Sequence, residues 1–218
     1  MLSVSKLPPC ANVKQNINRL LSFFFHLFKK FFTGKTTNEP YLKGDLLFMG
    51  KRIAAVLTNL FEDSEYTEPT AAFKDAGHTV ITIEKSEGAK VKGMKEGTEI
   101  TIDERIDGVS VDDFDALFIP GGFSPDQLRA DDRFVAFTKA FMDANKPVFA
   151  ICHGPQLLIT AKSLEGRDVT GYKSIQVDLE NAGANFHDKE VVVCQKQLVT
   201  SRTPDDLPAF IRESLNLL

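Results

Sequence analysis

Cys152 and His153 are adjacent in the sequence, and a cysteine and a histidine can form a thiolate–imidazole pair. The residues around them predict that the cysteine is reactive. The apolar residues 147–151 indicate a short buried strand, and Gly154-Pro155 leads into a segment with helical apolar spacing. Cys152 is therefore predicted on a sharp strand-to-helix turn, which exposes a nucleophile above a sheet. The positive end of the helix favours the thiolate, so we expect a Cys152 pKa well below the free-cysteine value of about 8.5. A buried, inert thiol at the end of a core strand is the alternative.

Three acidic residues, Glu62, Asp63 and Glu65, follow the first predicted strand, residues 53–58. A protonated carboxyl near the cysteine could donate a hydrogen bond to the thiolate, and a carboxylate could orient a substrate amine. The same acids could instead complement the dipole of the next predicted helix, residues 65–76. The residues themselves leave both roles open.

A glycine pair, Gly121 and Gly122, ends another predicted strand, residues 115–119. Glycines there allow the backbone to approach a ligand and to present N–H groups to a developing oxyanion, although an ordinary turn would also use them. Asp126 follows and could be a first-turn acid of a helix. His153 would act as the base, and a carboxylate on its other ring nitrogen would complete a Cys-His-acid arrangement.

Strands and helices alternate from residue 49 onward, and this pattern predicts an α/β fold. The sheet is expected to be doubly wound and mostly parallel, with helices on both faces and ligands bound beyond the carboxyl ends of its strands. The expected strands are 53–58, 78–84, 115–119, 147–151, 191–195 and 197–201, with a hairpin at 90–102, and the expected helices are 65–76, 131–144, 156–161, 178–182 and 204–217.

Composition limits the function classes. Of 218 residues, 43% are hydrophobic and 26% charged, and the net charge of −4 gives no basic surface for nucleic acid. The three cysteines, Cys10, Cys152 and Cys194, have no paired spacing, which favours a reducing compartment such as the cytoplasm. Cys194 is expected to pack in a strand. No ligand spacing indicates a metal site, and no cofactor is expected.

The first 48 residues differ from the rest of the chain, which divides into an extension, residues 1–48, and a domain, residues 49–218. No acidic residue occurs before Glu39, and the apolar residues of 17–32 fall at helical spacing opposite basic and polar ones. This basic amphipathic segment could bind a membrane surface. It could equally be an addition from an upstream start, since Met49 stands directly before the first predicted strand.

Four motifs follow one another along the chain. They are Phe61-Glu62-Asp63-x-Glu65, Pro120-Gly121-Gly122, Ala150-Ile151-Cys152-His153-Gly154-Pro155-Gln156 and Val199-Thr200-Ser201-Arg202-x-Pro204. Together they resemble the PfpI intracellular protease family, of the ThiJ/PfpI branch in the class I glutamine-amidotransferase-like superfamily. The resemblance covers about residues 51–218 and excludes residues 1–48. The resemblance implies a flavodoxin-like, glutamine-amidotransferase-like fold.

The resemblance also implies a catalytic triad. Cys152 would be the nucleophile and His153 its partner, and the acidic member falls at Asp126, contributed by a neighbouring subunit of a homodimer or larger homo-oligomer. The proteases that define this triad carry glutamate where this chain has Asp126, which is one methylene shorter. A less firmly held histidine weakens peptide hydrolysis more than it weakens thiol addition to a small aldehyde.

Further site residues follow from the same resemblance. Glu65 matches the glutamate that hydrogen-bonds the nucleophilic sulfur, and Glu62 matches a second glutamate of that motif. Tyr172 falls at an active-site tyrosine, and Gly122, beside Gly121, would supply an oxyanion donor together with the backbone of His153.

Three functions use this same thiolate. The first is a PfpI-type cysteine hydrolase that acts on peptides or reverses aldehyde adducts on proteins. The second is a cofactor-free glyoxalase that acts on methylglyoxal or glyoxal. The third is a redox sensor or holdase of the stress response, which turns nothing over. The expected ligands are therefore a small aldehyde, a peptide or a protein.

Overall fold

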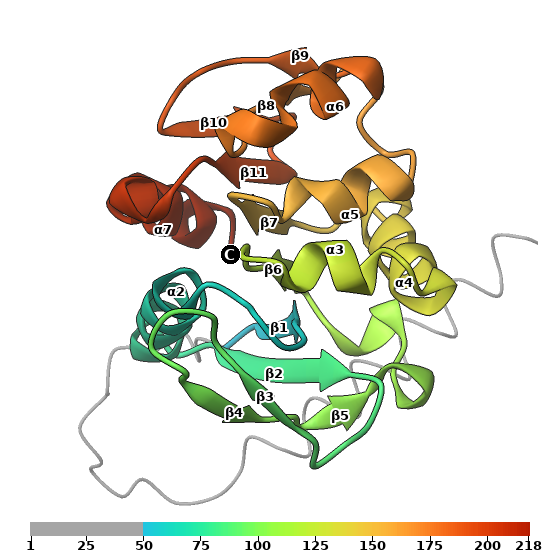
Figure 1. Ribbon diagram of the computed structural model, residues 1–218, viewed down its shortest axis with the longest axis vertical. Coiled ribbons are helices and arrows are strands. Elements are labelled where there is room, and N and C mark those ends of the chain that lie inside the picture. The colour runs from blue at the N-terminus through green and yellow to red at the C-terminus, as the bar shows by residue number, and fades with distance from the viewer. Residues whose placement is uncertain (1–49) are drawn as a thin grey trace, which may run out of the picture. The chain divides into compact units, whose positions relative to one another are not determined.

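The computed structural model describes residues 50–218, and Figure 1 shows their central β-sheet with helices beside it. The predicted extension, residues 1–48, lies outside the described residues. The main sheet has seven strands in the order β10-β11-β7-β6-β1-β2-β5. These strands are β1 (Arg52–Val56), β2 (Thr79–Glu84), β5 (Glu104–Arg105), β6 (Ala116–Ile119), β7 (Val148–Ile151), β10 (Val191–Cys194) and β11 (Leu198–Ser201).

Every neighbouring pair in this sheet is parallel except β10 with β11, which is antiparallel. The central strands β6 and β7 are buried at every position. A parallel sheet is covered on both faces, so its strands are continuous apolar runs rather than alternating ones. The prediction of a mostly parallel, doubly wound sheet is confirmed.

Helices form a layer on each face of the sheet. Successive residues of a strand point to opposite faces, and β1 accordingly divides its side chains between two hydrophobic clusters. Ile53 packs in one cluster with Phe73 of α2, whereas Ala54 packs in the other with Phe141 of α4. The described helices are α2 (Asp63–Asp75) and α7 (Leu207–Leu217) on the first face, and α3 (Ser124–Leu128), α4 (Asp132–Asp143), α5 (Pro155–Thr160) and α6 (Gln176–Asn181) on the second.

The predicted hairpin is present as β3 (Lys90–Lys92) and β4 (Glu99–Thr101), which pair antiparallel. Its tip is attached to the first turn of α2 by Asp63, whose carboxylate accepts the N–H groups of Lys95 at 2.9 Å, Glu96 at 3.2 Å and Thr98 at 2.9 Å. Burial raises the pKa of Asp63, but the hydrogen bonds outweigh it and lower the pKa to about 2. The hairpin therefore lies beside the loop that follows β1.

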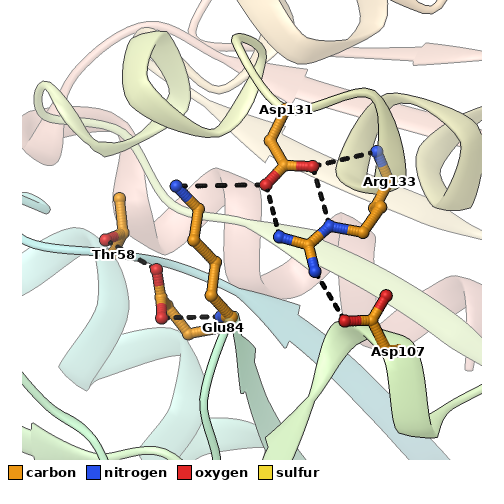
Figure 2. Close-up of polar contacts among 6 residues, drawn as sticks. Thr58, Glu84, Asp107, Asp131 and Arg133 are labelled. Atoms are coloured by element: carbon orange, nitrogen blue, oxygen red, sulfur yellow. Dashed lines mark hydrogen bonds and ion pairs between the residues drawn. The ribbon is translucent and has the colours of Figure 1, made fainter.

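Polar contacts join the loops at the carboxyl edge of the sheet, as Figure 2 shows. Glu84, at the end of β2, accepts from the hydroxyl of Thr58 at 3.2 Å. Arg133, in the first turn of α4, binds Asp131 at 2.7 Å and also contacts Asp107. These contacts fix the ends of three elements around the edge where a site is expected.

Several short elements were not predicted. They are the strands β5, β8 (Asp168–Val169) and β9 (Asn185–Phe186), the helix α3, and four 3₁₀ turns, η1 (Ile106–Gly108), η2 (Val111–Asp113), η3 (Lys173–Ile175) and η4 (Pro204–Asp206). Segments of two to five residues are too short to show a periodicity. Within residues 50–218, no helix is long and apolar enough to cross a membrane.

Candidate active site

Cys152 lies on the turn between β7 and α5 with a left-handed backbone, φ 60°. Its N–H donates to the carbonyl oxygen of Ser201, at the end of β11, at 3.0 Å. Gly154 closes the turn, because a Cβ there would lie 2.6 Å from the carbonyl oxygen of Ile119. A left-handed non-glycine residue persists only where its surroundings determine it, and it is characteristic of strained nucleophile turns. The cysteine is 7% exposed.

The glycine pair lies directly against this turn. A Cβ at Gly121 would be 2.3 Å from Glu65 Oε2 and 2.7 Å from Cys152 Cβ, and a Cβ at Gly122 would be 2.4 Å from the carbonyl oxygen of Leu60. Gly122 has φ +77° and its N–H is directed at the Cys152 sulfur, as is the N–H of His153. Glycine is therefore required at both positions, and two backbone donors converge on the nucleophile.

Glu65 reaches the sulfur from the first turn of α2 and is fully buried. Its Oε2 accepts the Gly121 N–H at 3.0 Å, and the carboxyl is also within hydrogen-bonding reach of the Cys152 thiol. Burial raises the pKa of Glu65 to about 8, and the charge of Glu62 adds to the rise while the Cys152 thiol opposes it. Glu65 consequently keeps its proton at neutral pH, beside the cysteine.

The charge on Cys152 depends on that proton. Burial raises the pKa of the Cys152 thiol, and a charged Glu65 raises it further, whereas the two backbone donors lower it. The low Cys152 pKa expected from the sequence is therefore not found, because burial is the largest effect on this thiol. The helix that motivated the expectation, α5, has six residues, and its dipole does not outweigh burial. A thiolate here requires a protonated Glu65.

His153 lies between the sulfur and a hydroxyl group. Its Nδ1 is 3.3 Å from Cys152 Sγ, and its Nε2 is 3.1 Å from Ser174 Oγ. The Tyr172 ring stacks on it, with centroids 4.8 Å apart and an interplanar angle of 29°. Burial lowers the pKa of His153, and the charge of Asp126 partly opposes this.

Asp126 lies in α3 and lines the same cavity as His153. Its Oδ1 is 3.3 Å from Arg129 Nε, one turn along the helix. Within the described chain, no hydrogen bond joins Asp126 to His153. The predicted contact across a subunit interface stays a prediction, since it involves a second copy.

The site opens into a cavity of about 490 Å³. Its walls bring together every predicted side chain of the site, Glu62, Glu65, Asp126, Cys152, His153 and Tyr172, with Met94, Lys95, Gly122, Phe123, Gln156 and Pro204. Lys95 Nζ lies 3.1 Å from Glu62 Oε1, so the hairpin supplies a cation at the rim. Among residues 50–218, no group of three His, Cys, Asp or Glu side chains could hold a metal ion.

Two residues of the site were missed in the sequence analysis. Ser174 lies in η3, and Lys95 in the hairpin tip. The hairpin was predicted, but nothing in the sequence placed its tip against the loop after β1. Ser174 has no motif around it, although the neighbouring Tyr172 was identified.

Comparison with known proteins identifies relatives of this chain. The DJ-1/PfpI family model matches residues 51–217. General stress protein 18 of Bacillus subtilis is 72% identical over 170 residues, which are 78% of this chain and 99% of that protein. Protein/nucleic acid deglycase 2 of Escherichia coli is 60% identical over 170 residues, with the same coverage of 78% and 99%. A two-domain protein of Anabaena variabilis, with DJ-1/ThiJ/PfpI-like and ferritin-like domains, has a TM-score of 0.74 at 36% identity, covering 76% of this chain and 47% of its own.

Proposed function

The chain belongs to the DJ-1/PfpI family, and from this premise we propose that it is a cysteine-dependent hydrolase that removes aldehyde-derived adducts from amines. Cys152 is the nucleophile, His153 the base and Glu65 the acid. The observation that carries the proposal is the buried Glu65 carboxyl, whose pKa of about 8 keeps a proton beside the nucleophilic sulfur. The relative named Protein/nucleic acid deglycase 2 supports the same class of substrate.

Glu65 and Cys152 lie too close together for both to be charged. Two charges so close in a buried site repel one another, so at most one of the two groups ionises readily. In the reactive state that we propose, the proton is on Glu65 and the charge is on the Cys152 sulfur, where the N–H groups of Gly122 and His153 stabilise it. The protonated carboxyl then serves as a donor to the oxygen of a substrate.

The proposed substrate is an aminocarbinol, the adduct of an α-dicarbonyl such as methylglyoxal with an amine. Its C–N bond breaks, and the amine leaves with the proton of the carbinol hydroxyl. Loss of the amine leaves a free aldehyde, and the Cys152 sulfur bonds to its carbon. The alkoxide formed by this addition takes the proton of Glu65. His153 then moves a proton from that carbon to its neighbour, which converts the hemithioacetal into a thioester. Water cleaves the thioester to an α-hydroxy acid, so one carbon is oxidised while its neighbour is reduced.

The contacts of Asp126 favour adducts over peptide bonds. A peptide amine is a poor leaving group and needs a firmly oriented histidine to deliver its proton. In this structure the Asp126 carboxylate, which would orient His153, is paired with Arg129 instead, with Oδ1 3.3 Å from Nε. An aldehyde carbon is more electrophilic than an amide carbon, and thiolate addition to it has less need of an imidazolium.

The test uses a preformed methylglyoxal adduct of Nα-acetyl-lysine, freed of unreacted methylglyoxal. The wild type should release Nα-acetyl-lysine and lactate at a rate that rises with enzyme concentration and exceeds the spontaneous dissociation of the adduct. Cys152→Ala should lose at least ~10³-fold in rate. Cys194→Ala is the matched control, because Cys194 is the other buried cysteine among residues 50–218 and lies in β10.

The alternative functions give different results in the same assay. A glyoxalase would consume free methylglyoxal, but adduct loss would never exceed the spontaneous dissociation rate. A peptidase would cleave a fluorogenic peptide and leave the adduct unchanged. If Cys152→Ala were as active as the wild type, the proposal itself would be wrong.

A homo-oligomer is part of this proposal, and an apolar rim at the cavity supports it. Leu60, Met94 and Phe123 are 45%, 49% and 50% exposed, and Met94 and Phe123 line the cavity. The N–H of Phe123 donates to the carbonyl oxygen of Leu60 at 2.8 Å, so these two lie together. Exposed apolar side chains gathered at one place mark an interaction surface. A second copy at this rim would lie near Asp126, and light scattering would detect it.

A further inference from the structure

A short segment, residues 170–175, crosses the turn that carries Cys152. The N–H of Thr170 donates to Thr200 Oγ1 of β11 at 2.9 Å, and the N–H of Tyr172 donates to the carbonyl oxygen of Cys152 at 2.9 Å. A Cβ on Gly171 would lie 3.4 Å from that same carbonyl oxygen. This segment, called the strap below, is thus fixed both to the sheet and to the nucleophilic residue itself.

Two side chains of the strap contact the His153 ring at different places. Tyr172 covers one face of the ring, with centroids 4.8 Å apart. Ser174 Oγ lies 3.1 Å from Nε2, while Nδ1 lies 3.3 Å from Cys152 Sγ. The strap therefore contacts the imidazole at its face and at Nε2, and Nδ1 faces the sulfur.

We propose that Ser174 is the positioning residue for His153, in the place that an acidic side chain occupies in a Cys-His-acid triad. The inference rests on the proposed function, because it assigns a role in the same reaction. When Ser174 Oγ accepts the Nε2 hydrogen, the ring has its lone pair on Nδ1, where it can take a proton from a substrate carbon. After that transfer Nε2 still carries its hydrogen, so the ring keeps its orientation throughout.

A hydroxyl group at this position gives His153 a different character from a carboxylate. A carboxylate stabilises the imidazolium and raises the pKa of the histidine. Asp126 is the charged group that raises the pKa of His153, and it is paired with Arg129. Burial lowers this pKa by more than Asp126 raises it, so the pKa of His153 stays below its usual value. Ser174 orients the ring without adding charge. A neutral base that returns its proton easily suits transfer between two adjacent carbons.

The test compares Ser174→Ala with three other variants in the adduct assay. Ser174→Ala should lower kcat by ~10-fold or more, with KM within about twofold, because an orienting contact of the general base is lost. The acidic limb of its pH–rate profile should move to lower pH, since the acceptor that stabilises the protonated ring is gone. Ser174→Thr keeps the hydroxyl and should recover kcat to within about threefold. Alkylation of Cys152 by iodoacetamide should change less than twofold in either variant.

Asp126→Asn tests the rival orienting group, and Gln176→Ala is the control for disturbance of the surface beside the strap. The Gln176 side chain is hydrogen-bonded to Lys173 and Glu180 and does not line the cavity, so its variant should behave like the wild type. A Ser174→Ala variant with wild-type kcat and pH profile would overturn the positioning role. So would a larger kcat loss in Asp126→Asn than in Ser174→Ala. Full activity of Cys152→Ala would instead overturn the proposed function, whatever Ser174 does.

Discussion

Asp63 and Glu65 lie two residues apart in the first turn of α2, but at neutral pH Asp63 is ionised and Glu65 is protonated. Both are nearly out of contact with solvent, at 2% and 0% exposed. Three backbone N–H groups of the hairpin point at Asp63, and its pKa falls to about 2. A single backbone N–H points at Glu65, and its pKa rises to about 8.

Two differences decide which acid is charged: Glu65 lies much deeper in the protein than Asp63, and it has fewer hydrogen-bond donors. A buried carboxylate with several N–H donors is stabilised in its ionised form, whereas one with few donors keeps its proton. Asp63 therefore fastens the hairpin to the helix, and Glu65 remains available as a proton donor. Neighbouring acids in one helical turn thus serve structure and chemistry separately.

The largest effect should come from removing the proton of Glu65. Glu65→Gln keeps an acceptor for the Gly121 N–H but cannot give a proton to substrate, so we expect kcat to fall ~10²-fold or more. Its Tm should not fall, since the variant buries no ionisable group. Steady-state kinetics and calorimetry on the same preparation measure both. Wild-type turnover in Glu65→Gln would remove Glu65 from the proposed mechanism.

Asp63→Asn should damage stability more than activity. The amide offers one oxygen to N–H groups that now bind a carboxylate, and we expect the free energy of unfolding to fall by ~3 kcal/mol. Urea denaturation measures this change. Asp75→Asn, at the exposed end of the same helix, is the control and should leave the midpoint unchanged. Equal effects of Asp63→Asn and Asp75→Asn would contradict the anchoring role.

The two acids should also give opposite pH dependence of stability. The pKa of Glu65 is raised from 4.5 to about 8, so its contribution is complete below about pH 4.5 and is lost as the pH rises to about 8. The pKa of Asp63 is lowered from 3.8 to about 2, so its contribution is present above about pH 3.8 and is lost as the pH falls toward 2. Denaturation midpoints across pH measure both slopes. Glu65→Gln should remove the first slope and Asp63→Asn the second.

The smallest effect is expected for Lys95→Met. Lys95 pairs with Glu62, and its charge lowers the pKa of Glu65 slightly. Without Lys95, Glu65 should hold its proton to higher pH, and the basic limb of the pH–rate profile should move upward by a fraction of a unit. Tm should not change measurably, because the Lys95 side chain is 63% exposed. An unchanged basic limb together with an acidic limb that moves to higher pH would show that Lys95 acts on the thiol rather than on Glu65.

Much of the fold could be predicted from the sequence, because the long elements carry strong periodicity. The strands at Val148–Ile151 and Leu198–Ser201 and the helix at Asp132–Asp143 all correspond to predicted segments. The short pieces β5, β8, β9 and α3 could not be predicted, since they depend on what they pack against. Local sequence carries little information about such segments.

The position of Cys152 on its strand-to-helix turn could be predicted, because one continuous motif determines that turn. The role of Glu65 stayed open because its pKa depends on burial by residues distant in sequence. Ser174 lies 21 positions from His153, and their contact exists only because the strap folds over the turn. The expected low pKa of Cys152 was wrong for a similar reason: a helix start is visible in a sequence, but the burial that outweighs it is not.

The bond from the Cys152 N–H to Ser201 has a consequence for protein synthesis. Ser201 ends β11, which pairs with β7 and follows Cys152 well downstream in the sequence. A ribosome adds residues in order and domains fold as their parts emerge. The strained turn at Cys152 therefore acquires its geometry only after β11 has been made. Until then the growing chain carries an ordinary cysteine, and reactivity appears together with completion of the fold.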